Sequence, residues 1–345
     1  MDFIGTRDIY SKLQDDYSRF LYEKRAMYCL TGNSSYMDDV LESVIDRDVF
    51  WKLMKKLESV KDKLAVRGAG NDYYVLKRLN PDLEFAFFVD YDVTKQGKVI
   101  DGKEVLTPDD FYEKYKDYYV LVNSTAANEE IVDDLKKHGI SDDKIFNLAV
   151  CYEGICDKQY FEENIMKSTS GEIFVDGGCY DGRTVRQFVK WCNGDYKKIF
   201  SFEPDSQNYE NAKRVFDEIG LTNIELLNRG LWSCERTLHF NADGSQGARI
   251  EENGGTTIHT ASIDDVVKNE RVTFIKLDVE GAEYEALIGA RKTIEKNRPK
   301  LAISIYHKPQ DIFELPELIM SIRDDYRMYL RHYQLSPNET ILYCV

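Results

Sequence analysis

Long apolar stretches are missing from this chain, and a leader sequence is not expected. No apolar run reaches the roughly 18 residues that cross a bilayer as a helix, and the first seven residues contain neither a basic nor an apolar segment of the kind that directs secretion. The seven cysteines are scattered and include no Cys-x-x-Cys pair, so a disulfide framework is not expected. The sequence therefore predicts a cytoplasmic protein with no membrane partner.

Positive charge is also scarce. The 345 residues include 46 Lys and Arg against 61 Asp and Glu, which gives a formal net charge of −15, and no basic stripe is present. Nucleic-acid binding needs clustered cations that neutralise phosphates, so no nucleic-acid partner is expected. The same charge disfavours a polyanionic substrate, although a local pocket can override this repulsion within a Debye length of about 8 Å. A substrate is therefore expected to be neutral near its reacting group.

Two common nucleotide-binding motifs are absent as well. A phosphate-binding loop needs Gly-x4-Gly-Lys-Ser/Thr, and neither Lys-Ser nor Lys-Thr follows the glycines of residues 177–182. The dinucleotide motif Gly-x-Gly-x-x-Gly fails because Cys179 stands at its second glycine, where the main chain must approach a pyrophosphate. What is present is Asp-x-Gly-x-x-x-Gly, formed by Asp176, Gly178 and Gly182. This pattern follows an apolar strand and opens a helix, as the first turn of an open α/β sheet does.

Two acids at strand ends favour an adenosine ligand that carries positive charge. S-adenosylmethionine has a sulfonium and an ammonium group, which a carboxylate at the first turn would stabilise, whereas the same carboxylate would repel a pyrophosphate. Asp176 is therefore expected to face this cofactor. Glu203 ends the next apolar strand, residues 199–202, and is expected to accept hydrogen bonds from both ribose hydroxyls. The alternative for Glu203 is a solvated acid at the start of the following helix.

Two later strand ends supply candidate catalytic residues. Asp278 and Glu280 follow the strand predicted at residues 272–277, and His307 follows the one predicted at 300–306. The two acids repel each other unless something compensates: the sulfonium, an acceptor hydroxyl in need of a base, or a divalent ion such as Mg²⁺. An imidazole with a pKa of about 6.5 suits a general base. The alternatives are helix N-capping by the acids and a merely solvated histidine.

The other four histidines do not predict a metal site. His239 and His259 lie in one region without a third ligand nearby, and His138 and His332 are expected to be structural. No residue is therefore assigned as a metal ligand, zinc is not expected, and Mg²⁺ stays an alternative.

Three blocks in the second half of the chain resemble the FkbM-type methyltransferases, a class I S-adenosylmethionine-dependent group. They are Val175-Asp-Gly-Gly-Cys-Tyr-Asp-Gly-Arg-Thr184, Phe202-Glu-Pro-Asp205 and Phe274-Ile-Lys-Leu-Asp-Val-Glu-Gly-Ala-Glu283. The first block departs from the family at Cys179 and Tyr180, where Ala and Asn are usual. The resemblance covers residues 170–345 and implies an α/β fold, a doubly wound, seven-stranded Rossmann-like sheet.

The resemblance also implies a cofactor, a reaction and a site. The cofactor is S-adenosyl-L-methionine, which leaves as S-adenosyl-L-homocysteine, and the reaction is O-methyl transfer to a sugar, glycan or secondary metabolite. The loop after the third strand often surrounds adenine in this superfamily, which adds residues 230–232 to the site. The residues expected to bind the cofactor are Asp176, Gly177, Gly178, Cys179, Tyr180, Gly182, Thr184, Glu203, Pro204, Gly230, Leu231, Trp232 and Asp278.

Length and element order predict two α/β units preceded by helices. We expect a helical segment at 1–62, a small Rossmann-like domain at 63–150, a connection at 151–170 and the methyltransferase-like domain at 171–345. In the small domain, strands are predicted at 63–70, 85–90, 118–123 and 144–148, with helices at 73–79 and 128–138. In the larger domain, helices are predicted at 182–192, 206–219 and 282–296, a third strand at 224–227, a hairpin-like insertion at 237–258 and an antiparallel hairpin at the carboxyl-terminal edge.

The small domain has a glycine turn and a strand-end acid of its own. Gly68 and Gly70 with Asp90 indicate either a second pocket for a nucleotide-linked acceptor or merely the close packing of a first βα turn. Two further functions stay open. One is a nicotinamide- or nucleotide-sugar-binding enzyme, which Asp90 favours and Cys179 disfavours; the other is a non-catalytic binding module, which the near-intact blocks disfavour. The sequence specifies no oligomeric state.

Overall fold

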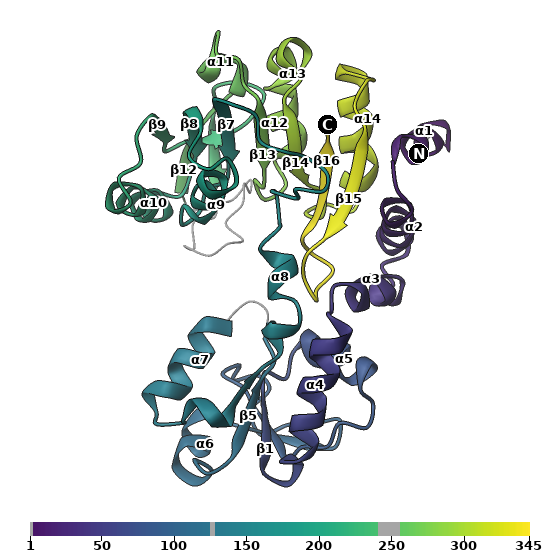
Figure 1. Cartoon of the computed structure of the whole chain (residues 1–345), viewed down its shortest axis with the longest axis vertical. Helices are drawn as coiled ribbons and strands as arrows, with labels where there is room; N and C mark the ends of the chain where they lie inside the picture. The colour runs from purple at the N-terminus through teal and green to yellow at the C-terminus, as the bar shows by residue number, and fades with distance from the viewer. Residues whose placement is uncertain (1–2, 125–127, 241–255) are drawn as a thin grey trace. The chain divides into compact units, whose positions relative to one another are not determined.

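The computed structural model describes residues 3–124, 128–240 and 256–345. The chain divides into two compact units (Figure 1). The larger contains Met1–Asn33, Lys158–Arg331 and Asn338–Val345; the smaller contains Ser34–Asp157 and His332–Pro337. This division differs from the expected one, because the first 33 residues group with the larger unit instead of forming one segment with residues 34–62.

The larger unit contains the predicted seven-stranded sheet, in the order β9-β8-β7-β13-β14-β16-β15. Its strands are β7 (Glu172–Gly177), β8 (Tyr196–Phe202), β9 (Ile224–Leu227), β13 (Phe274–Leu277), β14 (Lys300–Ser304), β15 (Met328–His332) and β16 (Thr340–Cys344). The five strands from β9 to β14 are parallel, and β16 runs antiparallel to β14. All residues of β7 and β13 are buried, as expected for central strands of a sheet covered on both faces.

Helices before, between and after these strands complete the larger unit. They are α1 (Phe3–Lys12), α2 (Asp16–Thr31), α9 (Arg183–Trp191), α10 (Ser206–Glu218), α11 (Ile263–Val267), α12 (Glu283–Ile288), α13 (Arg291–Asn297) and α14 (Asp311–Ile322). Helix α2 reaches the carboxyl-terminal strands, where the buried Arg25 donates to Thr340 Oγ1 at 2.8 Å. Phe188 of α9 stacks on Phe174 of β7 with ring centroids 4.2 Å apart. Such aromatic contacts fasten the helix to the sheet.

The helix predicted at 282–296 is broken in two, and the break has a packing cause. A Cβ atom on Gly289 would lie 2.2 Å from the carbonyl oxygen of Trp232, so only glycine fits between α12 and α13. The sequence pattern shows the apolar spacing of this helix but not the neighbour that interrupts it. Helix α14, which contains Pro316, was not predicted.

A small second sheet follows β9. Its order is β10-β12-β11, with β10 (Gly230–Leu231), β11 (Thr237–Phe240) and β12 (Thr256–Ala261). The antiparallel pairing of β11 with β12 agrees with the hairpin expected here. Its predicted turns lie in residues 241–255, outside the described residues.

The smaller unit contains a six-stranded sheet in the order β3-β4-β2-β1-β5-β6. The strands are β1 (Leu64–Arg67), β2 (Phe87–Val89), β3 (Val99–Ile100), β4 (Lys103–Leu106), β5 (Tyr119–Val122) and β6 (Ile145–Asn147). All neighbours are parallel except the edge pair β3 and β4. The parallel sheet agrees with the prediction, which lacked β3 and β4. The order reverses between β1 and β5, as at the ligand crevice of open α/β sheets.

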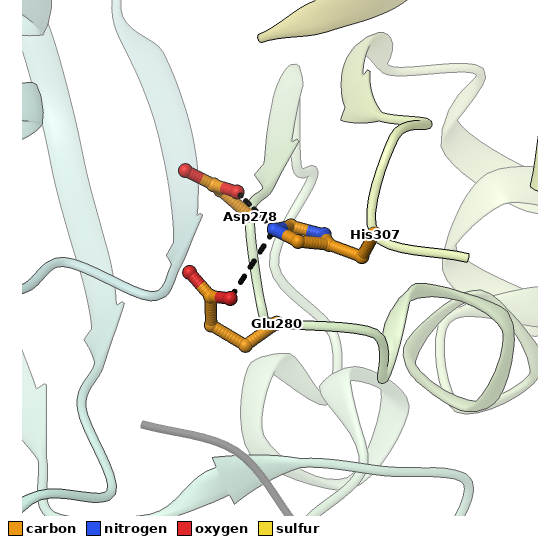
Figure 2. A group of neighbouring side chains, drawn as sticks. All are labelled: Asp278, Glu280 and His307. Atoms are coloured by element: carbon orange, nitrogen blue, oxygen red, sulfur yellow. Dashed lines mark ion pairs between the residues drawn. The ribbon is translucent and has the colours of Figure 1, made fainter. Parts of the chain in front are cut away.

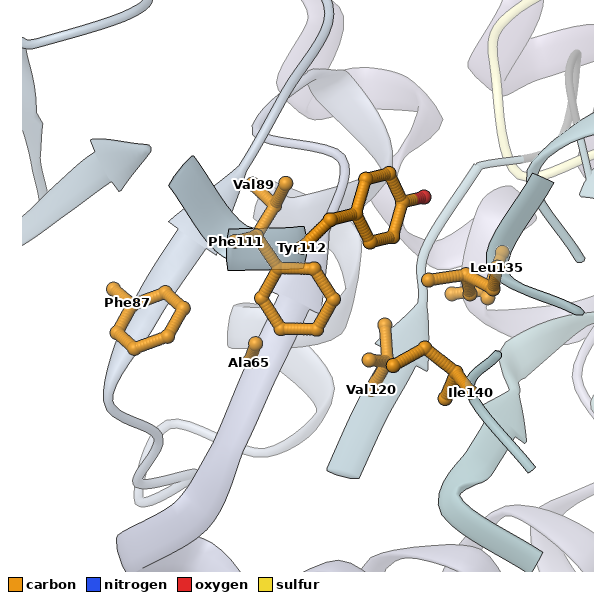
Figure 3. Close-up of a cluster of buried hydrophobic side chains, with 9 residues drawn as sticks. Ala65, Phe87, Val89, Phe111, Tyr112, Val120, Leu135 and Ile140 are labelled. Atoms are coloured by element: carbon orange, nitrogen blue, oxygen red, sulfur yellow. The ribbon is translucent and has the colours of Figure 1, made fainter. Parts of the chain in front are cut away.

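Helices and short 3-10 turns surround this smaller sheet. They are η1 (Ser34–Met37), α3 (Asp38–Ser43), α4 (Arg47–Glu58), η2 (Lys61–Lys63), α5 (Asn71–Leu79), α6 (Pro108–Lys114), α7 (Asn128–Lys137), η3 (Asp142–Lys144), η4 (Leu148–Cys151) and α8 (Glu153–Cys156). Figure 3 shows the core on one face of the sheet, where Phe87 and Val120 from the strands meet Phe111 of α6 and Leu135 of α7. The unit therefore has a hydrophobic core of its own. Among the described residues of the whole chain, no helix is long and apolar enough to cross a membrane.

Candidate functional site

The predicted glycine turn lies between β7 and α9, against the end of β13. Gly178 has φ +77°, and a Cβ atom there would lie 1.9 Å from the carbonyl oxygen of Asp278. Gly182 has φ +80° and has Phe216 2.6 Å from its Cβ position. Glycine is therefore required at both positions by the left-handed backbone and by close packing. This packing brings the turn beside the candidate catalytic acid Asp278.

The main-chain N–H groups of the turn are occupied within the protein. Those of Gly178 and Cys179 both donate to the carbonyl oxygen of Phe202, at 3.0 and 3.1 Å, and that of Tyr180 donates to Glu203 Oε2 at 2.9 Å. The Cys179 side chain is only 1% exposed, and burial raises the pKa of its thiol. The turn thus positions Glu203, while the Cys179 side chain packs in the core.

Asp176 has a different environment from the one predicted. Its carboxylate is fully buried and lies 3.2 Å from Lys276 Nζ, which is 1% exposed. The two residues face each other in the register of β7 and β13. Lys276 was missed by the sequence analysis, although a lysine within an apolar strand was a signal. The charge that was expected to face a cationic cofactor is therefore already paired.

Glu203 lies one residue beyond β8, where the prediction placed it. Its Oε2 accepts from the main chain of Tyr180 and its Oε1 from that of Asp205, at 2.9 and 3.0 Å. The side chain is largely buried, and burial is the main reason why the pKa of Glu203 is raised to about 7. A carboxylate has about four acceptor positions, so each oxygen retains one for a further donor. This geometry suits the two hydroxyls of a ribose.

The other predicted cofactor residues surround the same turn to different degrees. The Leu231 side chain lies 2.7 Å from the Cβ position of Gly177, and Gly230 has Pro204 within 3.8 Å of its own Cβ position. Trp232 is half-buried and follows β10, and Thr184 is half-buried in the first turn of α9. Leu231 thus lies next to the glycine turn and Gly230 next to Pro204, while the carbonyl oxygen of Trp232 lies against Gly289.

The three predicted catalytic side chains converge at the carboxyl ends of β13 and β14. His307 Nε2 lies 3.5 Å from Asp278 Oδ1 and 3.4 Å from Glu280 Oε2 (Figure 2). The chain turns sharply here, because Glu280 has φ +53° and Gly281 φ +93°. A left-handed non-glycine residue is uncommon and often belongs to a functional site. Asp278 and Glu280 are 23% and 31% exposed, so a ligand can reach them.

Glu283 supports His307 from the other side. Its Oε1 lies 2.9 Å from His307 Nδ1 and accepts from the main chain of Val279 at the same distance. Burial lowers the pKa of His307, but Glu283, Glu280 and Asp278 outweigh burial and raise it to about 11. Without a ligand, His307 is therefore an imidazolium at neutral pH. A general base must lose this proton first.

A second group of side chains around Asp278 was not predicted. Tyr160 donates to Asp278 Oδ2 at 2.7 Å, and the Tyr306 hydroxyl lies within hydrogen-bonding distance of Asp278 Oδ1 (3.2 Å) and of Glu339 Oε1 (3.0 Å). Burial and the charge of Asp278 raise the pKa of Glu339 to about 7. Burial opposes ionisation of Asp278, but Lys276 and His307 lower its pKa. Asp278 is thus an oriented carboxylate, held by residues far apart in the sequence.

The same cluster can accommodate a metal ion. Among the described residues, Asp278, Glu280 and His307 form a group whose possible ligand atoms lie within 4.8 Å of one another. The acids were expected as an alternative Mg²⁺ site, and the structure adds an imidazole, which favours transition metals over Mg²⁺. His259 lies near Thr237 Oγ1, at 3.2 Å, and His138 stacks on Tyr112, so both have structural contacts.

Comparisons with known proteins find two family matches and several solved structures of similar fold. Residues 176–334 match the family described as Methyltransferase FkbM domain, and residues 60–146 match the family described as C2185-like, N-terminal. A methyltransferase FkbM from Methylobacillus flagellatus KT is 20% identical in sequence, with a TM-score of 0.52 over 91% of this chain and 100% of that one. This likeness shows a shared fold.

Two other solved structures are more distant. An rRNA methylase from Streptococcus thermophilus is 15% identical over 56% of this chain and 93% of that one, with a TM-score of 0.35. Fibrillarin from Aeropyrum pernix, solved with natively bound S-adenosyl-L-methionine, is 12% identical over 56% of this chain and 74% of that one, with a TM-score of 0.35. No curated protein matches the sequence.

Proposed function

We propose that this chain transfers a methyl group from S-adenosyl-L-methionine to a hydroxyl of a sugar, glycan or secondary metabolite, because residues 176–334 match the family described as Methyltransferase FkbM domain. The observation that carries the proposal is the carboxylate of Glu203. It lies beside the glycine turn and has one acceptor position free on each oxygen. These two positions suit the two hydroxyls of the cofactor ribose.

The charge of the neighbouring cluster supports a cationic cofactor. Asp278, Glu280 and Glu283 surround the single imidazolium of His307, so the cluster keeps a net negative charge. A sulfonium and an ammonium group are attracted to such a site. The electrostatic argument made for Asp176 thus applies instead to the end of β13.

Methyl transfer requires mainly positioning by the protein. Bound S-adenosyl-L-methionine supplies an activated methyl group, and the protein must hold the acceptor oxygen in line at about 3–3.5 Å. Asp278, fixed by Tyr160 and Tyr306, can orient the acceptor hydroxyl. A cation bound beside the cluster would offset the negative charges that raise the pKa of His307. The pKa of His307 would then be lower than in the unliganded protein. Once the imidazolium has released its proton to solvent, the neutral His307 can accept the hydroxyl proton.

Calorimetry with S-adenosyl-L-homocysteine tests this assignment. Glu203→Ala should weaken binding by about 2–4 kcal/mol, since it removes two hydrogen bonds to a charged acceptor. Glu225→Ala is a matched control, because Glu225 is an exposed acid of β9 paired with Lys198. Unchanged affinity in Glu203→Ala, or tighter binding of NAD than of S-adenosyl-L-homocysteine by the parent, would overturn the proposal.

The acceptor can be sought with a labelled methyl group. Incubation with isotopically labelled S-adenosyl-L-methionine and sets of free sugars, nucleotide-linked sugars and polyketide alcohols should transfer label to an oxygen of one class. Transfer to nitrogen or carbon would contradict the O-methyl assignment while leaving the cofactor assignment intact.

A further inference from the structure

The acid at the end of the second strand of the smaller unit makes an unexpected set of hydrogen bonds. Asp90 lies one residue beyond β2, next to the turn that follows β1. Its Oδ2 accepts from the main chain of Ala69, within that turn, at 2.8 Å. Its Oδ1 accepts from the main chain of Asp92 at 2.9 Å. The side chain is 13% exposed, so a ligand can contact it.

The same arrangement is present at Glu203 in the larger unit. That acid also lies one residue beyond the second strand of its unit, and one oxygen accepts from the glycine turn of the neighbouring strand, at the main chain of Tyr180. The other oxygen accepts from the residue two positions on, Asp205. Asp90 and Glu203 thus accept equivalent main-chain hydrogen bonds. At Asp90, Lys95 Nζ also donates to Oδ2 at 3.3 Å, so Oδ1 is the oxygen with an acceptor position left for a ribose hydroxyl.

The turn beside Asp90 has features that suit phosphate. Gly68 has φ +112°, and a Cβ atom there would lie 2.4 Å from the carbonyl oxygen of Asn123, so the turn requires glycine. Gly70 is the N-cap of α5, and no side chain caps this nine-residue helix. Lys95 Nζ lies 3.9 Å from the Cβ position of Gly70. Lys95 pairs with Asp90 and Asp92, at 3.3 and 3.5 Å, so it would have to turn from these acids toward a bound anion. The uncapped helix N-terminus itself favours an anion.

Buried polar groups at the adjoining strand ends have unused hydrogen-bonding capacity. Asn123, after β5, is 2% exposed; its Nδ2 donates to the carbonyl oxygen of Gly68 at 3.4 Å, while its Oδ1 has no hydrogen-bond partner among the described residues. Arg67, at the end of β1, is also 2% exposed, and its Nε and Nη2 form no hydrogen bond there. Its guanidinium lies 4.2 Å from the ring centre of Tyr91 and 3.8 Å from Asp134. Unsatisfied buried polar groups are rare, and one explanation is a missing ligand.

We propose that the smaller unit contains a second ligand site, for a nucleoside diphosphate group, at the carboxyl ends of β1, β2 and β5. Asp90 would accept from a ribose hydroxyl through Oδ1, and the turn of residues 68–70 would hold the diphosphate, to which Lys95 would move from its pairs with Asp90 and Asp92. The ribose role of Asp90 rests on the proposed function, because it is inferred from the equivalent geometry of Glu203. A free nucleoside diphosphate and a nucleotide-linked sugar share this chemistry. Such a sugar would fit the acceptor class proposed for the methyl transfer.

Calorimetry on the full chain with UDP and UDP-glucose tests the site. The protein is first saturated with S-adenosyl-L-homocysteine, so that UDP and UDP-glucose do not bind at the proposed cofactor site of the larger unit. Asp90→Asn should weaken UDP binding about tenfold or more, because charged-acceptor hydrogen bonds are lost. Lys95→Ala should weaken it about fivefold or more and reduce its salt dependence. Lys114→Ala is the matched control, since this exposed lysine of α6 pairs with Asp110 and should leave UDP binding unchanged.

The outcomes separate this site from the methyltransferase site. The second site is supported if UDP binding is unchanged in Glu203→Ala and weakened in Asp90→Asn. This result would support it even if S-adenosyl-L-homocysteine does not bind and the proposed function is wrong. Tighter binding of UDP-glucose than of UDP identifies a nucleotide-linked sugar as the ligand, and the reverse identifies the free nucleotide. Absence of UDP binding at millimolar concentration, or unchanged binding in both Asp90→Asn and Lys95→Ala, would overturn the proposal. Circular dichroism of each variant excludes unfolding as the cause.

Discussion

The carboxylate of Asp176 lies 3.2 Å from the ammonium group of Lys276, with both side chains buried in the central strands of the larger sheet. Lys276 also donates to the carbonyl oxygens of Gly177 and Gly178, at 3.0 and 2.6 Å. Because these carbonyls begin the glycine turn, the lysine fastens the turn to β13. The glycine turn and strand β13 are thereby held together by one buried cation.

Replacement of this cation should destabilise the protein strongly. Lys276→Met leaves Asp176 buried without a cationic partner, and breaking a buried pair in this way costs about 3–5 kcal/mol. Urea denaturation at neutral pH measures the loss, and addition of Asp176→Asn should restore part of it. Lys198→Ala, which breaks an exposed pair with Glu225, should cost less than about 1 kcal/mol. A loss that small in Lys276→Met would contradict the structural role of the pair.

The free energy of unfolding should depend on pH, because the pKa of Glu203 differs between the folded and the unfolded chain. Its pKa is raised from 4.5 to about 7 in the folded chain. A raised folded pKa contributes stability that is fully present below the unfolded pKa and lost as pH rises through the folded one. This contribution therefore declines between pH 4.5 and about 7, by at most about 3.5 kcal/mol at about 1.4 kcal/mol per pKa unit.

Glu203→Gln should remove that decline. Denaturation at several pH values across this window should show a flatter stability profile for Glu203→Gln than for the parent. The comparison uses slopes, because glutamine also changes the hydrogen bonds to the main chain of Tyr180 and Asp205. Identical slopes in the two proteins would show that Glu203 titrates normally.

His307→Ala should impair turnover more than cofactor binding. A positioned general base contributes roughly 10²–10⁴-fold to rate, so single-turnover kinetics should fall by that factor while affinity for S-adenosyl-L-homocysteine stays within a few-fold. Asp278→Asn should reduce both, since this acid can face the cation and the acceptor. His138→Ala, in the smaller unit, is the control and should leave turnover unchanged. Full activity of His307→Ala would remove the base assignment.

Chelation tests whether the cluster of Figure 2 works with a metal. We expect EDTA-treated protein to retain its turnover, because the His307 imidazolium already lies between the carboxylates of Asp278 and Glu280. Turnover abolished by EDTA and restored by Mg²⁺ or Mn²⁺ would instead make these three residues metal ligands. Metal analysis of the purified protein provides a second readout.

Limited proteolysis tests the boundary between the units. The first cut by trypsin should follow Lys158, because Asp157 and Lys158 are exposed where the chain passes from one unit to the other, while Tyr160 and Phe161 are buried. The two fragments should appear together on a gel. A first cut within residues 171–300 would show that the boundary is elsewhere.

The sequence by itself determined the edge of the sheet at which the site forms. Apolar strands that end in Asp176, Glu203, Asp278 and His307 were readable from the residue pattern, and parallel strands bring their carboxyl ends to one edge. The position of the glycine turn was also readable from the sequence. Gly178 and Gly182 stand where the backbone has a left-handed conformation that other residues rarely adopt.

Only the tertiary structure decided how these groups are charged and paired. Asp176 meets Lys276 through the register of two strands about 100 residues apart in sequence, and Asp278 meets Tyr160 through a similar separation. His307 changes from a free base to an imidazolium because three acids converge on it out of water. A pKa depends on distances to other charges and on burial, and neither quantity follows from local sequence.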